Sequence, residues 1–473
     1  MNSLTRRAGL RNVLHSASRI TAISVFVLAP FPLGSVDLVW ICVWTVLLVF
    51  SLLTADLGGT SREQVGLLLP LFATIAMIGG IVTLQAWPDP PIGQADPVWE
   101  LPTQFLGLTV PHRISMTATG PWLAFGYPLL LSLAFVRAVF LATDAKAAQQ
   151  LLRILAWAGC AYAVYGIWAQ IADPGTLLFK RKEAYLGFAT GTFVNRNTAA
   201  TFWGSCALLF LVPLLRFLHR RDRHDAPPSD QRMARLSYYF SLPAALAGGF
   251  ILCTLATAMT GSRAGLLLSI CACLLAGGLY LAPLDVGKLR RWTLLAAAAV
   301  IALLLLELIG GVVAGRILAY GLVDEQRLGA YRTSIAIIRE HPLFGIGLGS
   351  FEAVFPSYRP AELGSYGVWD RAHSTPLELA VELGLPAAIV IVASGLWYIY
   401  HLIRGSLLRR RDRYIPIIGT SVAALGLLHS SIDFSLQIPG YGVFFAAITG
   451  CGLAQCLPSS MRKNGGGVMM SEL

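Results

Sequence analysis

The chain has 473 residues, of which 56% are hydrophobic and 13% charged, and its formal net charge is +11. Leaving out the 15 Tyr and counting the 46 Gly brings the apolar share to roughly 63%, against about 45–50% in soluble domains. A soluble enzyme could not bury so much apolar surface. With 8 Cys and no three-residue glycine period, disulfide scaffolds and collagen are also excluded. We therefore predict an all-α polytopic membrane protein.

Runs of about 20 apolar residues, the length that crosses a bilayer, predict about twelve transmembrane helices. The predicted spans are 19–34, 38–55, 65–86, 119–142, 151–171, 198–217, 238–260, 263–282, 292–313, 375–403, 415–433 and 440–457. This count divides the chain into helices 1–4 (1–150), helices 5–9 (151–313), a long loop (314–374), and helices 10–12 with a tail (375–473).

The basic residues lie in short clusters between the apolar runs, such as 220–223, 288–291 and 409–411. This distribution encodes membrane topology and predicts that both termini are cytoplasmic. It does not form the single basic stripe that nucleic-acid binding requires, so we expect no nucleic-acid partner. Three segments on the outer side are then long enough to contain an active site: 87–118, 172–197 and 314–374.

Two arginines stand at the outer ends of predicted spans. Arg196 lies in GTFVNRN and Arg263 in the tight turn TGSRAG. A single arginine at this depth can simply extend toward a lipid phosphate. Two on one face, each flanked by glycine and small polar residues, favour an anion site, because a guanidinium binds phosphate through two parallel hydrogen bonds.

The long loop contains a segment with helical periodicity, 326–341. One face carries apolar side chains and another carries two arginines, Arg332 and Arg339. The apolar face is predicted to contain Leu328, Tyr331, Ile335 and Ile338. We expect an amphipathic helix at the membrane interface. The next segment, PLFGIGLGSF, lacks the strand and the Gly-Lys-Ser/Thr of a phosphate loop, so its glycines indicate backbone turns.

His373 lies where the tenth span begins, with Arg371 beside it and Ser374 available as a cap. A neutral imidazole at that position is suited to removing a proton from a hydroxyl, although a lone histidine is usually structural. His429 and Asp433 are four residues apart near the end of the eleventh span. For them a structural hydrogen bond is the favoured interpretation and a catalytic duty the alternative.

These motifs, in this order, resemble the O-antigen ligase and polymerase superfamily of bacterial envelope glycosyltransferases. The resemblance covers about 185–440 and rests on GTFVNRN, TGSRAG, HPLFGIGLGSF and the histidine that opens the tenth span. The ligase pattern is met at His373, Ser374 and Gly384, whereas its last position, Gly, Thr or Tyr, is Ala387 here.

The resemblance implies transfer of a glycan from an undecaprenyl-diphosphate carrier to a hydroxyl, at the periplasmic face of the bacterial inner membrane. A ligase would use the lipid A–core as acceptor. His373 is then the expected base, and Arg196, Arg263 and Arg332 are expected to bind the diphosphate. Supporting roles are expected for Arg371, His429 and Asp433. Attack opposite the leaving group would invert the anomeric centre.

No Asp-x-Asp motif occurs in the chain, so we expect no metal and no cofactor, with arginine in place of Mg²⁺. The other expected partners are membrane lipids. Alternatives remain open: a polysaccharide polymerase, a transferase that glycosylates protein side chains, a multi-span transporter or a non-catalytic scaffold. Against a transporter, the chain shows no two-half symmetry, and its polar residues gather at the outer interface.

Overall fold

The computed structural model describes residues 2–56, 60–221, 232–284, 325–363 and 369–457. Within them the protein is helical except for one small antiparallel hairpin, in which β1 (Thr176–Leu177) pairs with β2 (Lys180–Arg181). The all-α prediction therefore agrees with the described part of the chain.

The helices of the N-terminal half are α1 (Asn2–Leu28), η1 (Leu33–Ser35), α2 (Leu38–Leu53), α3 (Arg62–Gly66), α4 (Leu69–Ala86), η2 (Pro97–Glu100), α5 (Leu101–Leu106), α6 (Gly120–Leu141), α7 (Ala145–Ala172) and α8 (Arg196–Arg221). Those of the C-terminal half are α9 (Arg232–Met259), α10 (Arg263–Leu281), α12 (Glu325–Glu340), α13 (Phe351–Tyr358), η4 (Ala361–Leu363), α14 (Thr375–Leu383), α15 (Leu385–Leu408), α16 (Tyr414–Ser430), η5 (Ser435–Gln437) and α17 (Pro439–Ala454).

Seven of the described helices are long and apolar enough to cross a membrane, and each overlaps a predicted span. Three further predicted spans correspond to shorter apolar helices, α2, α16 and α17. The predicted span 19–34 overlaps α1 only as far as Leu28, where that helix ends. The span predicted at 292–313 lies outside the described residues, so a count of twelve remains a prediction.

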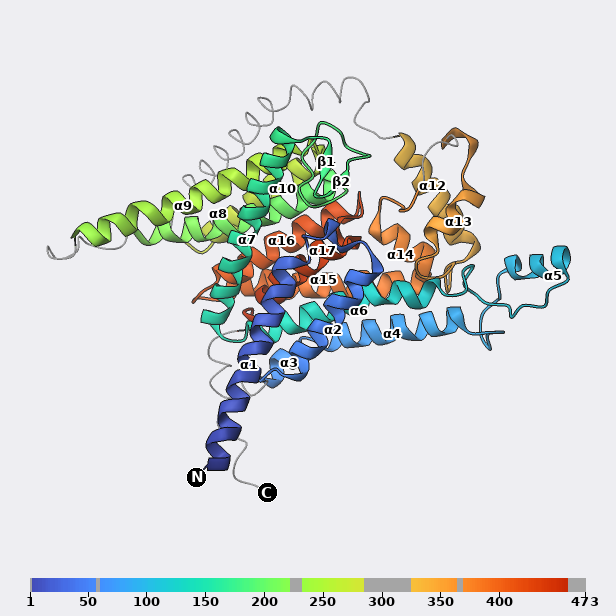
Figure 1. Ribbon diagram of the computed structural model, residues 1–473, viewed down its shortest axis with the longest axis horizontal. Helices are drawn as coiled ribbons and strands as arrows, with labels where there is room; N and C mark the ends of the chain where they lie inside the picture. The colour runs from blue at the N-terminus through green and yellow to red at the C-terminus, as the bar shows by residue number, and fades with distance from the viewer. Residues whose placement is uncertain (1, 57–59, 222–231, 285–324, 364–368, 458–473) are drawn as a thin grey trace.

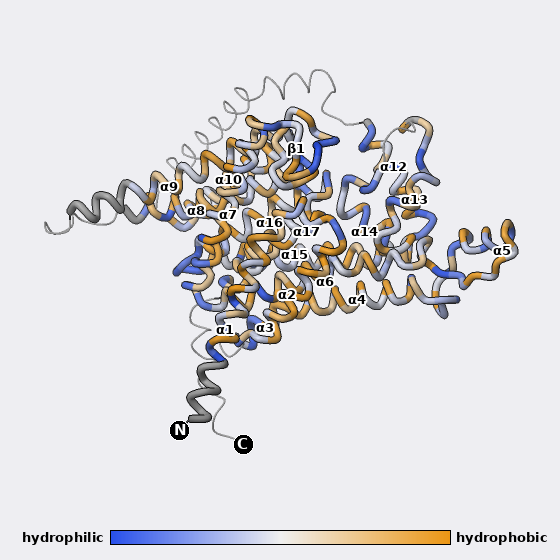
Figure 2. The backbone as a smooth tube through the Cα atoms, in the orientation of Figure 1, coloured by the Kyte–Doolittle hydropathy of each residue, from blue (hydrophilic) through white to orange (hydrophobic). Residues whose placement is uncertain are grey.

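The centre of the bundle is formed by α8, α16 and α17, whose side chains are mostly buried. Small residues allow these helices to approach closely, as membrane helices commonly do. At the crossing of α16 and α17, a Cβ built on Gly419 would lie 3.0 Å from the Cα of Gly452. Figure 2 shows apolar residues along the bundle helices and polar residues near β1 and beside α14.

The described parts of the three predicted outer segments meet at one end of the bundle. The amide of Met116 donates to the carbonyl of Ile346 at 3.0 Å, and the side chains of Asn197 and Arg327 both contact Asp433. Figure 1 shows α12, α13 and α14 side by side at this end. The opposite end holds the ion pair of Arg216 with Asp412, at 3.0 Å.

The predicted tenth span is two helices. The break is at Gly384, with φ 85° and ψ 161°, so the spanning helix α15 begins only at Leu385. A Cβ on Gly384 would lie 2.2 Å from the carbonyl oxygen of Leu343, so no other residue fits there. The short helix α14 and the loop before it are therefore not part of the membrane-spanning helix α15.

The helix predicted at 326–341 is α12, but its predicted apolar face is wrong in part. Leu328 and Ile335 are exposed, whereas Ala330, Ser334 and Ile337 are buried. This face packs against α13, α14 and η4. Small side chains at Ala330 and Ser334 permit that contact. The helical period of the sequence is compatible with burial of either face, and tertiary packing decides which one is buried.

Candidate functional site

His373 lies just before α14, in a backbone conformation that constrains its ring. Its φ is +53°, a left-handed value that is uncommon outside glycine. The ring packs edge-on against Trp369 and Phe434, with centroids 5.5 and 5.0 Å away. The hydroxyl of Tyr331 donates to the carbonyl of His373 at 2.9 Å. The imidazole is therefore fixed, and 21% of the side chain remains exposed.

The Nδ1 atom of His373 lies 3.9 Å from Oδ1 of Asp433, whose side chain is 2% exposed. Oδ2 of Asp433 accepts from the Nδ2 of Asn197 and lies 3.3 Å from Nη2 of Arg327. The backbone amide of Phe434 donates to Oδ1 at 2.7 Å. A buried carboxylate needs such partners, and here they balance its charge and hold it beside the imidazole.

His429 and Asp433 do not lie on one helix face, although their four-residue spacing predicts that they do. Helix α16 ends at Ser430, so Asp433 lies in the turn that follows. The Nδ1 of His429 is 2.9 Å from the hydroxyl of Ser435 instead. The hydrogen bond expected between His429 and Asp433 is therefore wrong, because the helix ends too early to keep the spacing.

Arg196 begins α8, and its guanidinium lies over the rings of Phe188 and Tyr185, 4.5 and 5.3 Å from their centroids. Burial raises the pKa of Tyr185, and the charges of Asp433 and Asp370 raise it further, whereas Arg196 and Arg327 lower it. Charges of both signs therefore act on this one tyrosine. The N-terminus of a long helix also favours an anion.

Arg263 begins α10, where the hydroxyl of Ser262 caps the helix by accepting from the amide of Gly265 at 3.2 Å. The preceding Gly261 has φ +61°, and a Cβ on it would lie 2.4 Å from the ring of Phe188. The same ring that supports Arg196 therefore covers the turn of Arg263. Phe188 thus packs against both the turn before Arg263 and the guanidinium of Arg196.

The other predicted residues lie differently. Arg332 is exposed on α12, and its predicted role in diphosphate binding stays a prediction. Arg371 forms an ion pair with Glu378 at 3.0 Å. Oε2 of Glu378 also accepts from the amide of Ala372 at 2.8 Å, so this pair shapes the backbone next to His373.

The glycine-rich segment uses its amides within the protein. Gly345, Gly347 and Gly349 all have positive φ, as turns require. Ile346 donates to the carbonyl of Val381 at 2.9 Å. The carboxylate of Glu382 accepts from the amide of Phe351 at 3.1 Å, and burial raises the pKa of Glu382 to about 8. The prediction of turns rather than a phosphate loop is confirmed.

Sequence reasoning missed Arg327 and Asn197 as members of the site. Asn197 stood inside the quoted motif GTFVNRN, next to Arg196, and Arg327 lies in the first turn of the predicted helix. Only an arginine five residues further along, Arg332, was selected. A signal existed for Asn197 in its motif, but none distinguished Arg327 from the other arginines.

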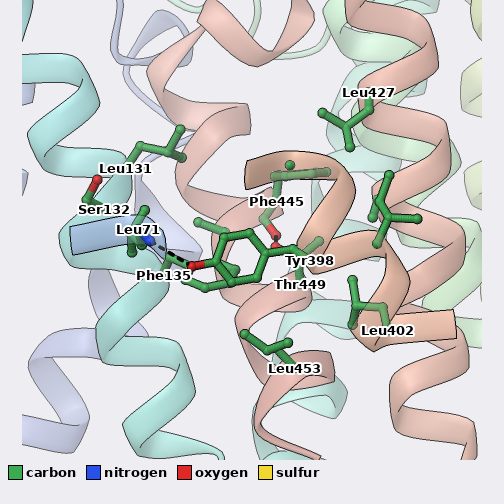
Figure 3. Close-up of a pocket in the computed structure, with 14 residues that line it drawn as sticks. Leu71, Leu131, Ser132, Phe135, Tyr398, Leu402, Leu427, Phe445, Thr449 and Leu453 are labelled. Carbon is green, nitrogen blue, oxygen red and sulfur yellow. Dashed lines mark hydrogen bonds between the residues drawn. The ribbon is translucent and has the colours of Figure 1, made fainter. Parts of the chain in front are cut away.

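A cavity of about 170 Å³ lies elsewhere, in the middle of the bundle among α4, α6, α15, α16 and α17 (Figure 3). Its lining is apolar, and the amide of Leu71 donates to the hydroxyl of Tyr398 at 3.0 Å. None of the lining residues is an acid, a histidine or a basic residue. The cavity is therefore separate from the chemistry at His373.

Taken together, the geometry suits proton removal next to an anion. With Nδ1 facing Asp433, Nε2 is the imidazole nitrogen that can take a proton, and the carboxylate stabilises the cation that results. Arg327 supplies positive charge at Asp433, and Arg196 lies over the ring of the neighbouring Tyr185. Within the described ranges, no three His, Cys, Asp or Glu side chains gather where they could hold a metal ion.

Residues 248–392 match the family model described as O-antigen ligase. This match confirms the resemblance to the O-antigen ligase and polymerase superfamily for that part of the chain. It includes Arg263 and His373, whereas Arg196 and Asp433 lie outside the matched residues. No curated protein matches the chain.

Proposed function

We propose that the chain is a membrane glycosyltransferase that moves a glycan from an undecaprenyl-diphosphate carrier to a hydroxyl acceptor at the periplasmic face. The O-antigen ligase match supports this class of reaction. The proposed acceptor is the lipid A–core, as for a ligase. A polymerase, which would use the growing glycan as acceptor, is the second candidate because Ala387 departs from the ligase pattern.

One observation carries the proposal: His373 lies 3.9 Å from the buried carboxylate of Asp433, and Arg327 lies 3.3 Å from the same carboxylate. In this mechanism Nε2 of His373 takes the proton of the acceptor hydroxyl. The hydroxyl oxygen forms a bond to the anomeric carbon, while the bond from that carbon to the diphosphate oxygen breaks. The arginines stabilise the negative charge that develops on the diphosphate.

This chemistry requires no metal ion, because guanidinium groups provide the positive charge. The acceptor attacks from the side opposite the diphosphate, so the anomeric centre is inverted. Three arginines lie at the bundle end opposite His373. Arg216 contacts the carboxylate of Asp412. Arg409 donates to the carbonyl of Arg411, and Arg413 donates to the carbonyl of Tyr280. Basic residues favour the cytoplasmic side, and this supports a periplasmic position for the site.

The function is tested by the glycan profile of a deletion strain, compared on a gel with the strain complemented by the full-length gene. Accumulation of long polymer that is not joined to the lipid A–core is the expected result. Accumulation of single repeats would replace the ligase assignment by the polymerase. An unchanged profile would overturn the proposal in both forms.

Arg196→Lys and Arg263→Lys are each expected to lower transfer by at least about tenfold, because lysine keeps the charge but loses the planar fork that binds two oxygens. The measurement is transfer from a lipid-diphosphate donor by purified protein. The control is Arg153→Lys, since Arg153 is exposed on α7 and lies outside the site. Full activity of both site variants would show that these arginines only contact lipid.

A further inference from the structure

A second cationic group lies in α6, and its chemistry is unrelated to the site of His373. Arg137 is 2% exposed. Its Nε donates to the hydroxyl of Ser51 at 2.7 Å, and its Nη2 to that of Ser18 at 3.1 Å. The guanidinium thus joins α6 to α1 and α2.

The two serines supply oxygen atoms but no negative charge. The hydroxyl of Ser18 donates to the carbonyl of Ser51 at 2.6 Å, and the hydroxyl of Ser51 donates to the carbonyl of Ser18 at 2.7 Å. Both hydroxyl protons are therefore used, and each oxygen accepts from Arg137. Among the described residues, no carboxylate lies within ion-pair distance of Arg137. A buried charge without a counter-charge is costly, so an external anion would stabilise it.

More positive charge lies around Arg137. Arg19 follows Ser18 on α1, is half-buried, and acts on Arg137 through its charge. His15 lies one turn earlier, and its buried Nδ1 bonds to no described atom. The nearby pair of Arg11 and Asp56 is exposed, so its carboxylate is already matched by an arginine. The positive charges of Arg137 and Arg19 therefore favour an anion here.

The depth of the group indicates which anion. Arg137 lies four residues before the end of α6 at Leu141, which is about 6 Å along the helix. Ser51 lies two residues before the end of α2 at Leu53. The following carbonyl of Ala142 accepts from Gln455, at the end of the bundle opposite His373. If α6 ends at the membrane surface, a guanidinium at this depth is within reach of the phospholipid phosphates of that leaflet.

We propose that Arg137 and Arg19 form a binding site for the phosphate of an anionic phospholipid at the end of the bundle opposite His373. Ser18 and Ser51 position the guanidinium by accepting from Nη2 and Nε, and Nη1 is the nitrogen that would donate to a phosphate oxygen. Arg19 supplies a second cation from the neighbouring helix. Basic pockets between membrane helices bind anionic headgroups in this way.

The test measures the binding of cardiolipin to the purified full-length protein in neutral detergent, by native mass spectrometry. Arg137→Gln and Arg19→Gln are each expected to weaken binding at least about tenfold, because each removes a charge-assisted contact with phosphate. Arg153→Gln is the matched control, since it removes an exposed positive charge from α7. Its binding should equal that of the wild type.

Equal binding by wild type, Arg137→Gln and Arg19→Gln would overturn the site, as would an equal loss in Arg153→Gln. Phosphatidylethanolamine that binds as tightly as cardiolipin would show that the headgroup charge is not recognised. Inorganic phosphate that displaces cardiolipin at equal concentration would assign the site to a free anion instead of a lipid. If Arg137→Gln fails to fold, Arg19→Gln decides, because Arg19 is not the arginine that Ser18 and Ser51 position.

Discussion

Replacement of His373 by alanine is expected to lower glycan transfer by about 10²–10⁴-fold, the range that general-base catalysis contributes. The expectation follows from a ring that is held between Trp369 and Phe434 and faces the buried Asp433. Transfer is measured with purified protein and a lipid-diphosphate donor, and folding is checked by the elution profile and the thermal unfolding midpoint.

His373→Asn is the second variant, because the φ of +53° at this position is tolerated better by asparagine than by alanine. It keeps the backbone while removing the base, so it should lose as much activity as the alanine variant. His112→Ala, in the outer segment 87–118, is the control and should transfer normally. Wild-type transfer by folded His373→Asn protein would exclude this histidine as the base.

Asp433→Asn is expected to lower transfer by about 10²-fold or more, because the imidazole loses the carboxylate that orients it and stabilises its cationic form. The substitution also leaves Arg327 without its counter-charge and sets a second amide against Asn197. Part of the loss is therefore structural, and a single variant does not separate the two effects.

The double variant His373→Asn/Asp433→Asn separates them. If Asp433 acts through His373, the loss of transfer in the double variant should be clearly smaller than the product of the two single losses, because residues that work as a unit are not additive. Independent, multiplicative losses would instead show that Asp433 has a structural role only. Thermal unfolding of all three variants reports any change in folding separately from the transfer rate.

Much of the site was already predictable from local features of the chain. Arg196 and Arg263 were identified because each is a charged residue at the edge of an apolar run. A charge there costs free energy, so it usually has a functional or structural partner. His373 was identified from its place at the start of a span. The glycines at 345, 347 and 349 were assigned to turns because no phosphate-loop residues follow them, and their positive φ values confirm this.

The amino-acid sequence by itself determined the helical class, the position of seven spans and the placement of these charged groups, because each depends on hydropathy and on neighbours within one or two helical turns. Only the tertiary structure decided that Asp433 faces His373 and not His429, that Arg327 and Asn197 hold it, and which face of α12 is buried. The contacts of Asp433 join residues that are about 60 to more than 230 positions apart in the sequence. They depend on how the helices pack and where each helix ends, and local periodicity does not predict either.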